Sequence, residues 1–181
     1  MSRNQKIIFV SIAIIGILAY GGYKLYWLVT PHRGPAFETK EIASNSFKIR
    51  ITAYEERGVW LPGAFYVFES SPIGSTEWRE VMSLHADDPN PIPRSVGGII
   101  NQQTGYIYMQ NLYALTTDGA RTWSIWDAAK ELQDRQDIFS RSIEVVEVAA
   151  DGAGRMRLYA FPRESTTYLV TKDYGQHWSV E

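Results

Sequence analysis

The chain has no cysteine among its 181 residues, and that absence removes several kinds of chemistry at once. It forms no disulfide, offers no thiolate as a nucleophile or metal ligand, and cannot carry the cysteine-linked lipid of a bacterial lipoprotein. The compartment stays open, because many exported proteins also lack disulfides.

Clustered positive charge is also scarce. The sequence holds 18 Lys and Arg against 20 Asp and Glu, for a formal net charge of −2. Three of the basic residues and none of the acids fall within residues 1–30, so residues 31–181 carry 15 basic and 20 acidic side chains. Because proteins bind phosphate backbones through clustered Lys and Arg, we predict that nucleic acid is not a partner.

Histidines number three and lie far apart in the sequence. The stretch "HADD", residues 85–88, offers oxygens to a hard cation, but a solvated loop is the simpler interpretation. The stretch "DGAG", residues 151–154, is typical of a hairpin turn, since it lacks the Lys-Ser/Thr pair that follows a phosphate loop. We therefore predict no metal site and no cofactor.

The first thirty residues contain a long apolar run. After Arg3 and Lys6, residues 7–23 are uncharged, and the run continues to Val29 with Lys24 as its one charge. About 20 residues at 1.5 Å each span a bilayer core. The favoured prediction is a transmembrane helix over residues 1–30 that acts as an uncleaved signal anchor. A signal peptide cleaved near Ala19 and a buried helix are the alternatives.

A membrane location follows from that prediction. Lys and Arg are slightly more frequent before the run than after it, which favours an N-terminus in the cytoplasm. The sequence therefore predicts a single-pass protein of the inner membrane with its C-terminal domain in the periplasm. Residues 31–46 are polar and contain Pro and Gly, which predicts a tether.

Beyond residue 46 the hydrophobic period is mostly two, which predicts an all-β domain over residues 47–181. Aromatic residues make up 13% of the chain, which suits sheet surfaces. A helix is predicted over residues 127–139, because Asp127 suits its N-cap and good helix formers follow. The eleven predicted strands cover residues 47–55, 64–71, 78–85, 96–102, 105–111, 112–118, 122–127, 142–150, 154–161, 166–173 and 177–181.

One turn occurs twice. "TTDGARTW", residues 116–123, and "TKDYGQHW", residues 171–178, share the pattern Thr-x-Asp-x-x-x-x-Trp. An Asp at that position can accept backbone N–H groups and close the turn, and Gly permits a left-handed backbone. The Trp opens the next strand and packs across the sheet.

The pattern resembles the Asp-box, Ser/Thr-x-Asp-x-Gly-x-Thr-Trp, of sialidases and other β-propellers with bacterial neuraminidase repeats. The two copies depart from it at Ala120 and His177. In that family the turn lies away from the catalytic centre, so the resemblance implies a structural role for its residues. The residues concerned are Thr116, Asp118, Thr122 and Trp123 in the first copy, and Thr171, Asp173, Gly175 and Trp178 in the second.

A decayed third copy is "SPIGSTEW", residues 71–78, which keeps Ser and Trp but has Ile73 at the Asp position. A period near 50 residues suggests repeated four-stranded meanders over residues 47–85, 96–127 and 142–181. Three such units are too few to close a propeller. We therefore predict an open, propeller-related or sandwich-like antiparallel domain with exposed sheet edges.

The function that these features favour is protein binding rather than catalysis. Nothing in the sequence shows the arginines converging on one site, so we predict that the chain is not an enzyme and has no catalytic residue. "LTTDGARTW" is similar to a turn in immunity proteins of type VI secretion lipases. That resemblance implies a membrane-anchored periplasmic protein that neutralises a secreted toxin. An envelope assembly or scaffold factor and a sialidase-like glycan-binding module are the alternatives.

One turn is predicted to contact the partner. In "ERGVWLPG", residues 56–63, Trp60 and Leu61 stand between Gly58 and the pair Pro62-Gly63. An apolar tip exposed there would suit a partner contact. The alternative is a loop folded back on the core.

Overall fold

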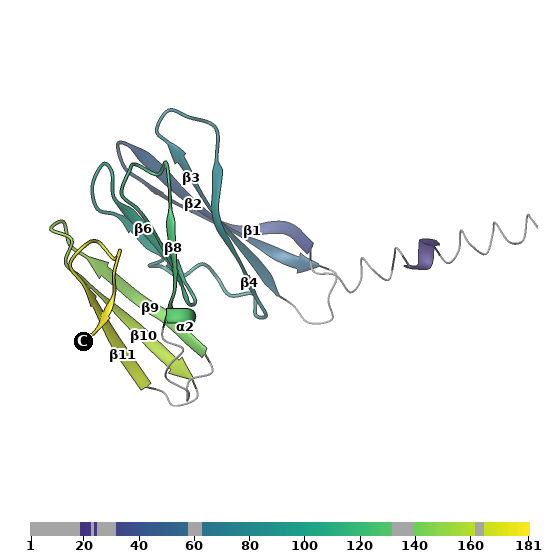
Figure 1. Ribbon diagram of the computed structural model, residues 1–181. Helices are drawn as coiled ribbons and strands as arrows, with labels where there is room; N and C mark the ends of the chain where they lie inside the picture. The colour runs from purple at the N-terminus through teal and green to yellow at the C-terminus, as the bar shows by residue number, and fades with distance from the viewer. Residues whose placement is uncertain (1–18, 23, 25–31, 58–62, 132–139, 162–164) are drawn as a thin grey trace, which may run out of the picture. The chain divides into compact units, whose positions relative to one another are not determined.

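The computed structural model describes residues 19–22, 24, 32–57, 63–131, 140–161 and 165–181. These residues form three four-stranded antiparallel sheets, each made of four consecutive strands (Figure 1). The domain is therefore all-β. The first sheet contains β1 (His32–Ala43), β2 (Phe47–Arg57), β3 (Ala64–Pro72) and β4 (Arg79–Ala86). The second contains β5 (Gly97–Ile99), β6 (Gly105–Met109), β7 (Leu112–Thr116) and β8 (Ser124–Asp127). The third contains β9 (Ser140–Val148), β10 (Gly154–Phe161), β11 (Ser165–Thr171) and β12 (Ser179–Val180).

The first strand was not expected. Residues 31–46 were predicted to be a tether, yet β1 runs over His32–Ala43 and pairs with β2. It lies at the edge of its sheet, where half-exposed polar side chains and a proline are tolerated. The predicted helix over residues 127–139 is described as α2 (Ala128–Glu131), and its remainder lies outside the described residues.

The prediction of a transmembrane helix is not supported. Of residues 1–30 the structure describes 19–22 and 24, which are helical, and the rest of the predicted span lies outside the described residues. No described helix has both the length and the apolar character needed to cross a bilayer, for which about 20 residues are required. The single-pass inner-membrane location that depended on this helix is corrected with it.

The described residues divide into two compact units. The first takes residues up to Glu38 with Thr52–Tyr66 and Leu84–Pro91. In it the hydroxyl of Tyr66 donates to the carbonyl of Asn90 at 2.5 Å, and burial raises the pKa of Tyr66. The second unit takes Thr39–Ile51, Val67–Ser83 and Ile92–Glu181, and it holds all three of the repeated turns.

The core of the second unit lies where the second and third sheets meet. Side chains of β6 and β7 pack there against side chains of β9, β10 and β11, with Tyr113 at the centre. The Tyr113 hydroxyl donates to the carbonyl of Tyr174 at 2.9 Å, and burial raises the pKa of Tyr113. The buried members of this core are Tyr108, Tyr113, Leu115, Ala128, Ile143, Val146, Met156, Leu158 and Leu169.

The opposite face of the third sheet is charged. Arg155 lies 3.9 Å above the ring of Tyr168 and 2.5 Å from a carboxylate oxygen of Glu181. Arg157 lies 2.6 Å from Glu144. Because these side chains alternate along β10 with the buried Met156 and Leu158, they point away from the core.

The first sheet carries the same arrangement within the second unit. Arg50 lies 4.1 Å above the Trp78 ring and 2.7 Å from Glu69. On the opposite face of β2, Phe47 is buried, and its ring lies against Gly105 of the second sheet. Both outer faces therefore hold an arginine between an aromatic ring and a carboxylate.

The hydroxyl of Tyr113 should contribute measurably to stability. Tyr113→Phe leaves the carbonyl of the partly buried Tyr174 without its donor, so we expect a loss of about 1 kcal/mol. Urea unfolding followed by tryptophan fluorescence measures it. Tyr168→Phe is the control, because the described residues give the Tyr168 hydroxyl no hydrogen bond. Equal losses in the two variants would contradict a specific role for the Tyr113 bond.

Candidate functional site

The three related turns occupy the same place in their sheets. Each one joins the third strand to the fourth: β3 to β4, β7 to β8, and β11 to β12. The repeated turn thus marks a repeated four-stranded unit, and the site is built around these turns.

Asp118 closes the turn of the second sheet with its own carboxylate. Oδ1 accepts the backbone N–H groups of Arg121 and Thr122, both at 3.0 Å, and the Thr116 hydroxyl at 3.0 Å. Oδ2 accepts the Thr122 hydroxyl at 2.6 Å. The Thr116 oxygen in turn accepts the N–H of Ala120 at 3.0 Å. Four donors therefore hold the carboxylate, as expected for a structural turn.

Asp173 does the same in the third sheet. Oδ1 accepts the Thr171 hydroxyl at 2.7 Å and the N–H of His177 at 3.0 Å, while Oδ2 lies 2.6 Å from Nδ1 of His177. The Thr171 oxygen accepts the N–H of Gly175 at 3.0 Å. His177 therefore supplies the side-chain donor that Thr122 supplies in the first copy.

These contacts change the acidity of both carboxyl groups. The hydroxyl and N–H of Thr122 lower the pKa of Asp118 to about 2. For Asp173, burial acts to raise the pKa, but the hydrogen bonds from His177 and Thr171 outweigh it and lower the value to about 2. Both groups are therefore charged throughout the neutral range.

Both turns need a left-handed backbone at two successive residues. The φ angles are 73° at Gly119 and 66° at Ala120 in one turn, and 65° at Tyr174 and 93° at Gly175 in the other. The first of each pair donates its N–H to the loop between the first two strands of its own sheet, Gly119 to Gln103 and Tyr174 to Gly152. Ala120, which stands where the Asp-box has glycine, adopts a conformation that costs a residue with a Cβ about 1–2 kcal/mol.

The decayed turn of the first sheet is held differently. Gly74 has a positive φ of 81°, and Gly119, at the same position of its turn, has one of 73°. Ile73 stands where the other turns have Asp, and it is 46% exposed. The hydroxyl of Ser75 takes over part of the carboxylate's role and accepts the N–H of Glu77 at 3.0 Å. Without the carboxylate, this turn has fewer internal hydrogen bonds.

The tryptophan of each complete turn reaches the preceding sheet. Nε1 of Trp123 donates to the Ser70 hydroxyl of β3 at 3.1 Å. The ring of Trp178 meets the ring of Tyr113 of β7 edge-on, with centroids 5.5 Å apart. Both contacts fall on the third strand of the sheet before, so the turns connect successive units.

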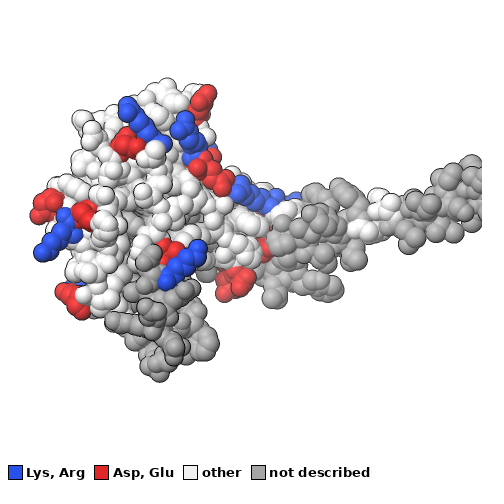
Figure 2. All heavy atoms as spheres, viewed as in Figure 1, with Lys and Arg blue, Asp and Glu red and all other residues white. Residues whose placement is uncertain are grey.

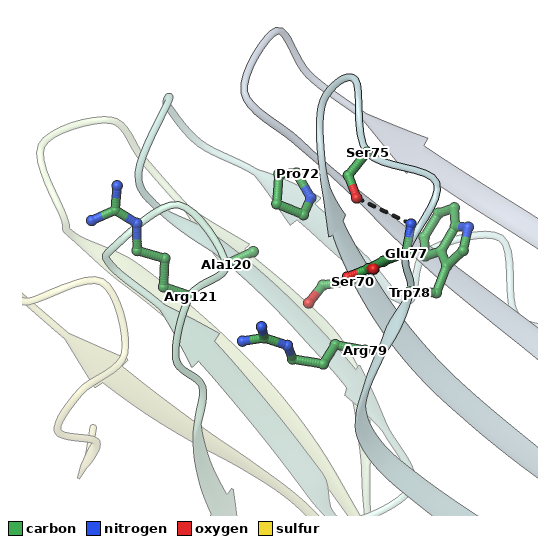
Figure 3. A pocket seen from close by; sticks show the side chains of 8 residues that line it. All are labelled: Ser70, Pro72, Ser75, Glu77, Trp78, Arg79, Ala120 and Arg121. Carbon is green, nitrogen blue, oxygen red and sulfur yellow. Dashed lines mark hydrogen bonds between the residues drawn. The ribbon is translucent and has the colours of Figure 1, made fainter.

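A groove of about 460 Å³ lies between the turn of the first sheet and the turn of the second. Figure 3 shows Arg79 reaching from one wall toward the turn that bears Ala120 and Arg121, while Arg121 extends outward from that turn. Trp78 is the one aromatic residue of the described lining. The residues that line the groove are Ser70, Pro72, Ser75, Glu77, Trp78, Arg79, Ala120 and Arg121.

The groove has an excess of positive charge in a domain of mixed charge. Figure 2 shows basic and acidic side chains close together over the visible face, with no broad region of one sign. Against that background Arg79 and Arg121 face a single carboxylate, Glu77. The sequence pointed to both turns but not to the arginines, since a spacing of 42 residues gives no sign that they meet.

The other candidate site residues from the sequence are not among the described residues that line this groove. Trp60 and Leu61, the predicted partner contacts, lie outside the described residues. His85 of the "HADD" stretch lies 2.9 Å from the buried carboxylate of Glu56. Within the described ranges no three His, Asp or Glu side chains are grouped so that they could hold a metal ion.

Acid should weaken the two Asp turns. Their folded-state pKa values of about 2 lie below the ordinary value of 3.8, so their contribution is complete above about pH 4 and disappears as the pH falls toward 2. We expect Asp118→Asn with Asp173→Asn to cost about 1–2 kcal/mol at pH 7, after allowance for solvent screening. Between pH 4 and 2 the variant should lose stability less steeply than the parent. Urea unfolding at a series of pH values tests this, and parallel curves would refute it.

Ala120→Gly should stabilise the domain. Glycine adopts a φ of 66° without strain, so we expect the free energy of unfolding to rise by about 0.5–1 kcal/mol. Ala153→Gly is the matched control, because Ala153 is exposed and does not have a positive φ; there glycine adds only unfolded-state entropy and should destabilise. Thermal unfolding measures the stability of each variant relative to the parent. A loss of stability in both would mean that Ala120 is not strained.

Comparison with known proteins does not identify the chain. No family model, no curated protein and no solved structure matches it. The resemblance to Asp-box proteins rests on the residues of the turns themselves, and the resemblance to immunity proteins stays a prediction.

Proposed function

We propose that the chain is a protein-binding domain that receives a segment of another protein in the groove between its first two turns. The observation that carries this proposal is the position of the groove beside two open sheet edges. Arg79 is the first residue of β4, and Arg121 comes three residues before β8. In the sheets that the described residues form, β4 and β8 each stand last in order.

An edge strand suits a polypeptide partner in particular. It presents backbone N–H and C=O groups that another chain can pair with, as in strand addition. β8 also exposes Ile125, whose side chain is 52% accessible. A segment that entered the groove could continue along such an edge and combine side-chain contacts with backbone pairing.

The partner that we propose is a secreted antibacterial toxin, which the domain neutralises by covering its active cleft. Support comes from the resemblance of "LTTDGARTW" to the turn of immunity proteins. Since Asp118 is held by four donors of its own turn, the turn acts as a scaffold, and recognition belongs to the surface beside it. Neutralisation by occlusion needs no catalytic group on the binding protein.

Growth rescue tests the proposal. The candidate toxin is the product of the gene next to the one that encodes this chain. We expect it to stop growth when it is made alone, and we expect co-production of the full chain to restore growth and to give a complex on gel filtration.

Leu158→Asp is the control for folding, because it places an unpaired charge at a fully buried position. That variant should not protect the cells. If the folded chain neither protects the cells nor forms a complex, toxin neutralisation is wrong.

A further inference from the structure

We propose that the groove binds the carboxylates of an acidic segment, supplied by the partner protein. The inference rests on the proposed function, because it names the chemistry of the segment that a protein partner would insert. Its basis is the set of hydrogen-bond donors that meet in the groove between the turn at residues 71–78 and the turn at residues 116–123.

Two arginines that line the groove have no partner among the described residues. Neither Arg79 nor Arg121 makes an ion pair or a side-chain hydrogen bond there. Three arginines of the sheet faces differ: Arg50, Arg155 and Arg157 lie 2.7, 2.5 and 2.6 Å from glutamate oxygens. The planar guanidinium fork matches a carboxylate, so two unpartnered arginines on the lining of one groove, with Arg79 reaching across it, are suited to an acidic ligand.

Two hydroxyl groups add to the donors. Ser70 accepts the N–H of Trp123 at 3.1 Å, and Ser75 accepts the N–H of Glu77 at 3.0 Å. Because each oxygen is already used as an acceptor within the chain, its O–H remains to donate. Ser70 is buried, which favours a ligand that accepts this bond over one that leaves it unmade.

Glu77 opposes an acidic ligand and so provides a second readout. Its carboxylate stands on the lining with Arg79, as Figure 3 shows, and reduces the excess of positive charge to one. Glu77→Gln removes that negative charge while keeping the side-chain shape. The substitution should therefore tighten the binding of an acidic ligand.

A peptide carboxylate fits the groove better than a sugar acid does. Sugars bind largely by stacking on an open aromatic face, but the Trp78 ring already has Arg50 4.1 Å and Lys48 5.1 Å from its centre. Trp123 is engaged with Ser70. The adjoining edge strands β4 and β8 offer backbone groups that a peptide can pair with and a sugar cannot.

Calorimetric titration of the full chain with short peptides tests the inference. The probes are a Glu-rich peptide, a Lys-rich peptide of equal length, and sialic acid. We expect binding of the Glu-rich peptide alone, with an affinity that falls as salt rises. Arg79→Ala with Arg121→Ala should weaken it at least about tenfold, and Glu77→Gln should strengthen it about two- to threefold.

Arg155→Ala with Arg157→Ala is the matched control, because it removes the same charge from the outer face of the third sheet. It should leave the affinity within about twofold, and circular dichroism should show that all variants are folded. Equal weakening by both pairs would show general charge attraction and overturn the inference, as would binding of sialic acid alone. Growth rescue that is independent of Arg79 and Arg121 would overturn it too, while leaving the proposed protein-binding function in place.

Discussion

The rest of the second unit depends on the contact that Trp123 and Trp178 each make with the sheet before their own. A four-stranded meander has two faces and cannot bury either of them alone. The turns solve this by placing Trp123 and Trp178 on the third strand of the preceding sheet. Each carboxylate holds the backbone of its turn, and that backbone sets the position of the Trp ring that follows. The local hydrogen bonds of Asp118 and Asp173 therefore determine how successive sheets meet, although neither carboxylate lies in the core.

Within the second unit, the parts of the first and third sheets that belong to it each have one face turned away from the second sheet. Here both faces are polar, and each uses an arginine between a ring and a carboxylate: Arg50 with Trp78 and Glu69, and Arg155 with Tyr168 and Glu181. Packing a further sheet against either face would bury these charges, at a cost of several kcal/mol per ion. The polar faces thus act as caps, which repeat proteins need at both ends. Their charges also disfavour association of these faces with a second copy of the chain.

Periodicity in the sequence was sufficient to predict most strands and the all-β class, because alternation along a half-buried strand is a local property. It failed for β1, whose position at an edge permits the Pro, Gly and charged residues that suggested a tether. The apolar run of residues 7–29 suggested a transmembrane helix, which the described residues do not support. The residues of the two Asp turns were found because their spacing is short and occurs twice. Arg79 and Arg121 were missed because only the approach of two sheets brings them to one groove, and no local pattern records that approach.

The turn of the first sheet differs from the other two, and it is the turn that forms one wall of the groove. In the turns of the second and third sheets, the Asp carboxylate accepts hydrogen bonds from its own turn, and the Trp packs against the preceding sheet. In the described residues no sheet precedes the first one, so Trp78 stacks on Arg50 of its own sheet. At the position that Asp118 and Asp173 hold in the other two turns, this turn has Ile73, which is 46% exposed. The turn of the first sheet contributes Ser75, Glu77 and Arg79 to the wall of the groove. Its side chains thus line a groove, whereas the carboxylates of Asp118 and Asp173 are used in the hydrogen bonds of their own turns.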